Sequence, residues 1–181
     1  EVGANTVTLT VTDVNGNVST CTATVTVEDN IDPTATCQDI TVQLDAAGNA
    51  TIVSADVDGG STDNCGSVTL APSPSTFDCT SLGVNTVTLT VTDSNGNVSI
   101  CTEDVTIEDN VDPNALFQDI TVQLDASGNA SITANDVDNG SSDNCSLTLA
   151  ATPLAFTCAN VGANTVTLTA TDGSGNTASC T

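Results

Sequence analysis

The sequence Asn85-Thr86-Val87-Thr88-Leu89-Thr90-Val91-Thr92 alternates strictly between apolar and polar residues. An alternation with period two places the valines and the leucine on one face of a β-strand and the threonines on the other. The next residues, Asp93-Ser94-Asn95-Gly96-Asn97, contain the Asn-Gly pair that favours a tight hairpin, and a second alternating run spans Val98 to Glu108. The whole stretch therefore predicts a β-hairpin with one apolar face. In the second run, the apolar residues change from even-numbered to odd-numbered positions between Ile100 and Val105. This change of face predicts a β-bulge near Cys101.

The chain repeats itself with a period of about 80 residues. The sequence Gln38-Asp39-Ile40-Thr41-Val42-Gln43-Leu44-Asp45-Ala46 returns unchanged at Gln118–Ala126. We therefore expect three segments. Residues 1–29 are the C-terminal hairpin of a truncated repeat, residues 30–109 are a complete repeat, and residues 110–181 are nearly a complete one.

The fold class follows from the strand signals within one repeat. The middle strands are expected at Ile52–Val57, Val68–Leu70 and Thr76–Cys79, and no stretch shows helical periodicity. About seven short strands with frequent turn signals predict an all-β fold. The expected architecture is a series of tandem β-sandwich repeats of the immunoglobulin or fibronectin-III type, arranged as beads on a string.

Composition excludes several classes of function. The 181 residues include 23 acids and no lysine, arginine or histidine, which gives a net charge of −23. Such a chain repels nucleic acid, and it has no apolar run long enough for membrane insertion. We expect no enzyme, because no histidine, lysine or tyrosine is present to activate a nucleophile. The missing initiator methionine and signal peptide indicate a piece of a longer secreted protein, cut at both ends.

The eight cysteines have an even, repeated spacing that is typical of disulfides and of an oxidising, extracellular setting. Zinc is not favoured, because the chain has no Cys-x-x-Cys pair and no histidine. In a seven-strand sandwich, strand order predicts the pairs Cys37–Cys101, Cys65–Cys79 and Cys145–Cys158. Cys21 then pairs outside the fragment, and Cys180 stays unpaired opposite Phe117. A rival scheme pairs Cys21 with Cys37 and leaves Cys101 free.

Acidic residues concentrate at the two junctions between repeats, Glu28-Asp29-Asn30-Ile31-Asp32-Pro33 and Glu108-Asp109-Asn110-Val111-Asp112-Pro113. Calcium prefers six to eight oxygen ligands, which acidic loops supply. In a sandwich, each junction lies at the same pole as two further loops, so we expect one calcium ion per junction. The alternative is that these acids are only solvated surface and turn residues. The candidate ligands are Glu28, Asp29, Asp32, Asp63, Asp93 and Asn97 at the first junction, and Glu108, Asp109, Asp112, Asp143, Asp172 and Asn176 at the second.

The repeated pattern resembles a known family. Its elements are Cys37, Asp63-Asn64-Cys65, Cys79, Gly83-x-Asn-Thr-Val, Thr92-Asp93-x-Asn-Gly-Asn97 and Cys101. This pattern is similar to the hyalin repeat (HYR) family, and more narrowly to the tandem HYR-like repeats of giant acidic surface adhesins of Bacteroidetes-type bacteria, which include gliding-motility adhesins. The resemblance covers essentially the whole chain and implies an extracellular adhesive or spacer role. The chain departs from the pattern at Phe117, which stands where Cys37 stands one repeat earlier.

These observations predict a structural segment of a long adhesin, stalk or filament, secreted or on the cell surface, that calcium and disulfides make rigid. The expected partners are neighbouring repeats of the same chain, with lateral self-association or surface glycans as further candidates. The alternative function is a calcium-dependent module that binds a glycan or another surface ligand.

Overall fold

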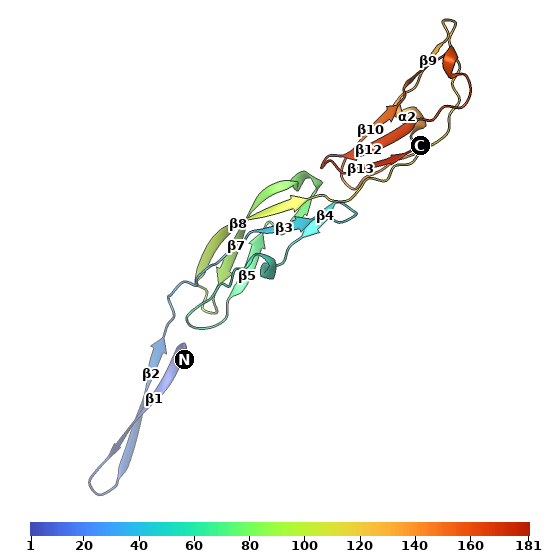
Figure 1. Cartoon of the computed structure of the whole chain (residues 1–181). Helices are drawn as coiled ribbons and strands as arrows, with labels where there is room; N and C mark the ends of the chain where they lie inside the picture. Colours follow the sequence, from blue (N-terminus) through green and yellow to red (C-terminus); the bar gives the residue numbers. More distant parts are fainter.

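The computed structural model describes all 181 residues and shows an elongated molecule of three consecutive units (Figure 1). The first unit is a lone hairpin of β1 (Gly3–Thr12) and β2 (Val18–Val27). The other two units are built of strands with a few single turns of helix. The fold is therefore all-β, as the alternation predicts. The helical turns are α1 (Ser54–Val57), α2 (Ala134–Val137) and the 3-10 turns η1 (Cys79–Ser81) and η2 (Cys158–Asn160).

The middle unit contains a four-stranded sheet in the order β3-β8-β7-β5 and a two-stranded ladder of β4 and β6. Strand β3 pairs with β8 in parallel, and the other pairs are antiparallel. The core joins apolar residues of the sheet, such as Leu89 and Ile107, to residues of the ladder side, such as Phe77. The strands are β3 (Ile40–Gln43), β4 (Asn49–Thr51), β5 (Thr69–Ser73), β6 (Thr76–Asp78), β7 (Gly83–Thr92) and β8 (Val98–Glu108).

The predicted bulge near Cys101 is wrong. Strands β7 and β8 pair without interruption from Gly83 opposite Ile107 to Thr92 opposite Val98. Ile100 is 65% exposed, so it lies on the outer face. The inner face of β8 includes Cys101, Glu103, Val105 and Ile107. Because one of these inward residues is an acid, the sequence does not show a regular alternation of apolar residues here.

The predicted strand Ile52–Val57 is also wrong over most of its length. Strand β4 ends at Thr51, and the chain then forms the single turn α1. The Asp56 carboxylate accepts a hydrogen bond from the backbone N–H of Val53 at 2.7 Å, which caps this turn. The turn buries Val57 completely.

The third unit repeats this arrangement with one strand fewer. It pairs β9 (Asn129–Ser131) with β11 (Ala155–Thr157), and it has a sheet in the order β10 (Leu147–Thr152), β12 (Thr167–Asp172) and β13 (Thr177–Cys180). Residues 120–123 have the sequence of β3 but form no strand. Their partner would be a strand equivalent to Val105–Glu108, whereas β13 ends at Cys180.

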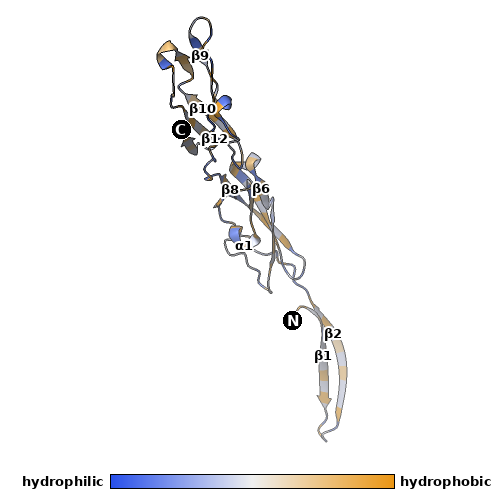
Figure 2. Ribbon diagram, turned by 90° about the vertical axis from the view of Figure 1, so that its right-hand side faces the viewer, coloured by the Kyte–Doolittle hydropathy of each residue, from blue (hydrophilic) through white to orange (hydrophobic).

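The β1–β2 hairpin lacks the strands that would cover its apolar face. Val7, Leu9 and Val11 are 51%, 59% and 57% exposed, whereas the equivalent residues of β7 are completely buried. Figure 2 shows apolar residues spread along both strands of this hairpin. Its conformation therefore depends on the ladder of hydrogen bonds between the strands and on the Asp13 carboxylate, which accepts hydrogen bonds from Asn15 and Asn17 in the turn.

Candidate metal centre and the joint between repeats

One predicted disulfide lies inside the middle unit. Cys37 is bonded to Cys101 of β8, with a sulfur–sulfur distance of 2.01 Å. This bond attaches the first residues of the unit to its last strand, as the sequence predicts. It also excludes the rival pairing of Cys21 with Cys37, and Cys21 is a free, exposed thiol. Cys180 is also free, and it packs on the same small core as Phe117, as predicted.

The second disulfide joins two units, which the sequence analysis did not predict. Cys79 is bonded to Cys145, so the predicted pairs Cys65–Cys79 and Cys145–Cys158 are wrong. The reason is the position of Cys79, which lies beside Gly48 and Asn144 at the C-terminal pole of the middle unit. Cys65 lies at the opposite pole of that unit, near Asp29 and Asp63. Cys65 and Cys158 remain free thiols.

Two acidic clusters occupy equivalent places at the N-terminal poles of the middle and third units. Each cluster contains one junction residue, one residue of the loop before a cysteine, and one residue of the final hairpin turn. In each cluster the three carboxylates contribute oxygens that all lie within 4.8 Å of one another. The clusters are Asp29, Asp63 and Asp93 in the middle unit and Asp109, Asp143 and Asp172 in the third unit.

The final hairpin turn holds its aspartate in place. The Asp93 Oδ1 atom accepts hydrogen bonds from the backbone N–H groups of Asn95 and Asn97, both at 2.8 Å. The Asn97 amide donates to Asp93 Oδ2 at 2.7 Å and to the carbonyl oxygen of Asp29 at 3.2 Å. Asn97 therefore fastens the junction to the turn.

The third unit repeats these contacts. The Asn176 amide donates to Asp172 Oδ2 at 2.7 Å and to the carbonyl oxygen of Asp109 at 2.9 Å. Both asparagines predicted as ligands thus position the cluster through their NH₂ groups.

The two turn aspartates keep their charge despite burial. Asp93 and Asp172 are each only 5% exposed. Burial by itself raises the pKa of each carboxyl group, but the side-chain amide and the backbone N–H groups of the turn outweigh it. The pKa of both groups is therefore lowered. Each cluster consequently contains an anionic carboxylate beside two further carboxylates, in a chain without basic side chains.

Several oxygens of the clusters are buried without any hydrogen-bond donor. They are Asp63 Oδ1 in the first cluster, and Asp109 Oδ2, Asp143 Oδ1 and Asn144 Oδ1 in or beside the second. Asp109 as a whole is 3% exposed. A buried carboxylate oxygen without a partner is costly, and a cation in contact with it removes that cost. The donor set is thus all oxygen, which suits a hard cation.

Four predicted ligands lie outside the clusters. Glu28, Asp32, Glu108 and Asp112 are exposed and belong to neither group of converging carboxylates. Glu108 instead accepts a hydrogen bond from the Gln43 amide at 2.8 Å. Each junction thus contributes one acid to its cluster, whereas the sequence suggested two or three.

Asn144 is a residue that the sequence analysis missed. Its amide donates to Asp109 Oδ1 at 3.1 Å and to the carbonyl oxygen of Asp45 at 3.2 Å. Asp45 belongs to the middle unit, so Asn144 connects the second cluster to the preceding repeat. The available signal was the triplet Asp-Asn-Cys, which occurs at both Asp63-Asn64-Cys65 and Asp143-Asn144-Cys145.

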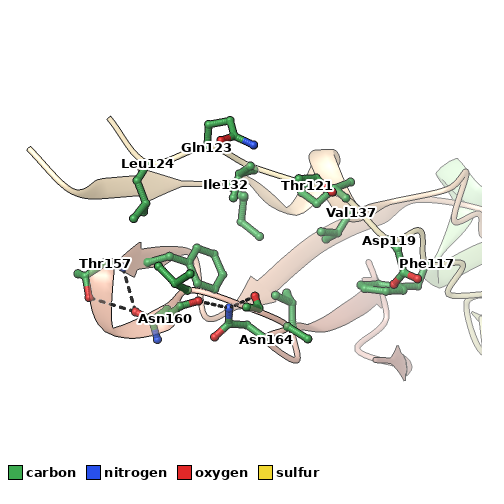
Figure 3. A pocket seen from close by; sticks show the side chains of 17 residues that line it. Phe117, Asp119, Thr121, Gln123, Leu124, Ile132, Val137, Thr157, Asn160 and Asn164 are labelled. Carbon is green, nitrogen blue, oxygen red and sulfur yellow. Dashed lines mark hydrogen bonds between the residues drawn. The ribbon is translucent and has the colours of Figure 1, made fainter. Parts of the chain in front are cut away.

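A cavity of about 760 Å³ opens in the third unit (Figure 3). Leu124 and Ile132 lie on one side of it, and Asn160 and Asn164 lie on the other. In the middle unit, the corresponding space is filled by the end of β8, which pairs with β3. This cavity therefore corresponds to the space that a β-strand occupies in the middle unit.

Comparison with protein-family models and with curated proteins finds no match. None of the helical turns is long and apolar enough to cross a membrane.

Proposed function

We propose that this chain is a structural segment of an extracellular adhesin, stalk or filament, built from sandwich repeats of the HYR type. In this proposal, calcium and disulfides make the joints between repeats rigid. The observation that carries it is the recurrence of a three-carboxylate cluster with buried, unpartnered oxygens at both junctions. The covalent bond Cys79–Cys145 at the second junction supports the same role.

The cluster dimensions support calcium. Calcium–oxygen distances of about 2.4 Å place any two ligands of one ion at most about 5 Å apart. The carboxylate oxygens of each cluster satisfy this limit. At the second cluster Asn144 Oδ1 is a further buried oxygen without a donor. Magnesium requires a stricter octahedral arrangement and retains its waters, so it suits these loops less well.

Binding at these positions would restrict motion between units. Asp109 belongs to the junction, whereas Asp143 and Asp172 belong to two loops of the third unit. A shared ion would attach the junction to the third unit, and Asn144 already attaches that unit to Asp45 of the middle unit. Because the three-carboxylate cluster and the asparagine contact to the junction carbonyl recur at both junctions, the arrangement favours a spacer over a single dedicated binding site.

The test is the midpoint of thermal unfolding with 2 mM calcium (about the extracellular level) or with a chelator, at constant ionic strength. A ligand that binds only the folded state raises this midpoint by mass action, by several degrees when it is present at about 100 times its dissociation constant. We expect calcium to act more strongly than magnesium. Asp109→Asn removes one charge from the second cluster and should weaken calcium binding there about tenfold or more.

The matched control is Asp104→Asn, which removes an equal charge from an exposed position on β8. It should leave the calcium effect unchanged. Equal midpoints with calcium, magnesium and sodium at matched ionic strength would overturn the calcium site.

A further inference from the structure

Each of the two larger units has one cysteine near each pole, namely Cys65 and Cys79 in the middle unit and Cys145 and Cys158 in the third. Cys79 at the C-terminal pole of the middle unit is bonded to Cys145 at the N-terminal pole of the third unit. By the repeat, Cys158 is equivalent to Cys79, and Cys65 is equivalent to Cys145. Both equivalents are free and exposed.

The C-terminal pole of the third unit has the geometry of the bonded pole. The Cys79 sulfur lies 3.7 Å from the carbonyl oxygen of Gly48, and the Cys158 sulfur lies 3.7 Å from that of Gly128. A Cβ atom on Gly48 would lie 2.7 Å from the Cys79 sulfur, and one on Gly128 would lie 2.6 Å from the Cys158 sulfur. In both turns the glycine makes room for a sulfur atom.

The N-terminal pole of the middle unit likewise matches its bonded counterpart. The Asp63 carboxylate accepts a hydrogen bond from the N–H of Cys65 at 2.9 Å, and Asp143 accepts one from Cys145 at 2.9 Å. Asn64 stands where Asn144 contacts the preceding repeat, and it is exposed, but its amide donates a hydrogen bond to the Cys65 sulfur at 3.3 Å. The backbone at Cys65 therefore matches that of the bonded loop, and only the Asn64 side chain has to turn from the Cys65 sulfur to the preceding repeat.

We propose that Cys65 and Cys158 are the two halves of the same inter-repeat disulfide. Each of these two cysteines forms a disulfide with a further repeat of the same kind, which is joined to this chain in tandem. The partner at Cys65 presents a glycine turn and a cysteine like Gly48 and Cys79. The partner at Cys158 presents an Asp-Asn-Cys loop. This inference rests on the proposed function for its extracellular setting, and it adds a covalent link from repeat to repeat.

The bond forms by thiol–disulfide exchange with a small disulfide such as oxidised glutathione. One cysteine thiolate attacks the oxidant and releases one glutathione thiol. The second cysteine thiolate then attacks the mixed disulfide and releases the other. The two cysteines together lose two electrons and two protons, and the oxidant is reduced to two thiols.

The link matters most in the third unit. That unit has Phe117 in place of Cys37, so it lacks a bond like Cys37–Cys101. A bond at Cys158, together with Cys79–Cys145, would give this unit a covalent path through the segment Cys145–Cys158 alone. A pulling force along the molecule would then pass through this segment and not through the other strands of the third unit.

The test uses the full chain extended by a second copy of residues 34–80 placed before Glu1. This addition keeps the register of the repeat and supplies copies of Cys37, Cys65 and Cys79. The protein is oxidised with reduced and oxidised glutathione, its free thiols are alkylated, and its disulfides are mapped by mass spectrometry. We score only molecules in which Cys37–Cys101 and Cys79–Cys145 have formed, which shows that they have folded.

We expect Cys65 to be bonded to the added copy of Cys79. Replacement of that copy by serine should return Cys65 to the alkylated fraction, as in the chain without the extension. Alkylated Cys65 in the extended protein, or Cys65 bonded to any other cysteine, would overturn the proposal. The mapping is done with calcium and with a chelator, so a missing calcium effect on unfolding and a missing bond are separate results.

Discussion

Glu103 is an unusual residue of the middle unit, because it is a buried acid without a partner. It is 3% exposed, and neither of its carboxylate oxygens has a hydrogen-bond donor. Burial raises its pKa above the ordinary value of 4.5, and the charge of Asp39 raises it further. Its sulfur neighbours Cys37 and Cys101 are bonded to each other, so they are not available to a metal.

The raised pKa makes the middle unit sensitive to pH. A group whose pKa is raised in the folded state stabilises the fold fully below its ordinary pKa. This contribution is lost as the pH rises through the raised value. Glu103→Gln should therefore become more stable relative to the unmodified chain between pH 4 and pH 7, by about 1 kcal/mol or more.

Urea unfolding in the presence of a chelator at several pH values measures this difference. Asp104→Asn is the control, since that neighbour is exposed on the same strand. A difference that does not change with pH would contradict the assignment to Glu103.

Gly48 supports the joint through its missing side chain. Its φ of +76° disfavours other residues, and a Cβ atom would meet both the Cys79 sulfur at 2.7 Å and the Asn144 carbonyl oxygen at 2.8 Å. Gly60 has a similar φ of +103° but has open space around it. Gly60→Ala should therefore cost about 1 kcal/mol from backbone strain alone.

Gly48→Ala should cost more, roughly 2–4 kcal/mol, and should slow formation of the Cys79–Cys145 bond. Urea unfolding and timed alkylation during oxidation measure the two effects. Equal losses in both variants would show that the close approach at Gly48 is unimportant.

At the scale of elements, equal sequences have different structures where their neighbours differ. Residues 40–43 and 120–123 are identical, yet only the former make a strand, because only they have β8 beside them. Ile120 and Val122 are consequently 40% and 44% exposed. The cavity in the third unit has the same cause (Figure 3).

A peptide of residues Thr102–Asn110 should therefore bind in this cavity, parallel to residues 120–123. Its Val105 and Ile107 would enter the core as they do in the middle unit, where they are 0% and 1% exposed. Saturating peptide should raise the unfolding midpoint of the third unit by a few degrees. The control is the same peptide with Val105→Asp and Ile107→Asp, which should not bind. Equal effects of the two peptides would contradict the assignment of the cavity to a strand.

At the scale of the whole molecule, the joint between the middle and third units has a covalent component, and the proposed calcium ion would add an ionic one. The Cys79–Cys145 bond closes a loop of 66 residues and, in the chain-entropy model, contributes roughly 4 kcal/mol. The acidic cluster lies next to this bond, since Asp143 is two residues from Cys145. Without a cation, the charge of −23 favours separation of the units.

Removal of both constraints should make the molecule flexible. We expect Cys145→Ser in chelator to have a broader range of dimensions in small-angle X-ray scattering than the unmodified chain in calcium. Either constraint alone should preserve much of the elongated shape seen in Figure 1. Cys158→Ser is the control, because Cys158 is free in this chain. The same scattering profile for the unmodified chain and for Cys145→Ser, each in calcium and in chelator, would show that direct contacts alone hold the joint.

The all-β class, the period of the repeat and the hairpin from Asn85 to Glu108 could be predicted from the sequence, which also favoured the Cys37–Cys101 bond over its rival. Alternation and Asn-Gly turns act over a few residues, and the repeat is visible without any structure. The sequence also located the acidic segments that converge in the structure, because aspartates in turns and junctions are local features.

Which ends of the strands meet depends on the three-dimensional packing of each unit. This packing placed Cys79 and Cys65 at opposite poles, which made the second disulfide a bond between repeats. The packing brings Asp29 and Asp109 into the acidic clusters and leaves Asp32 and Asp112 exposed outside them. Such choices depend on packing between residues that are far apart in the chain, and spacing along the sequence does not encode them directly.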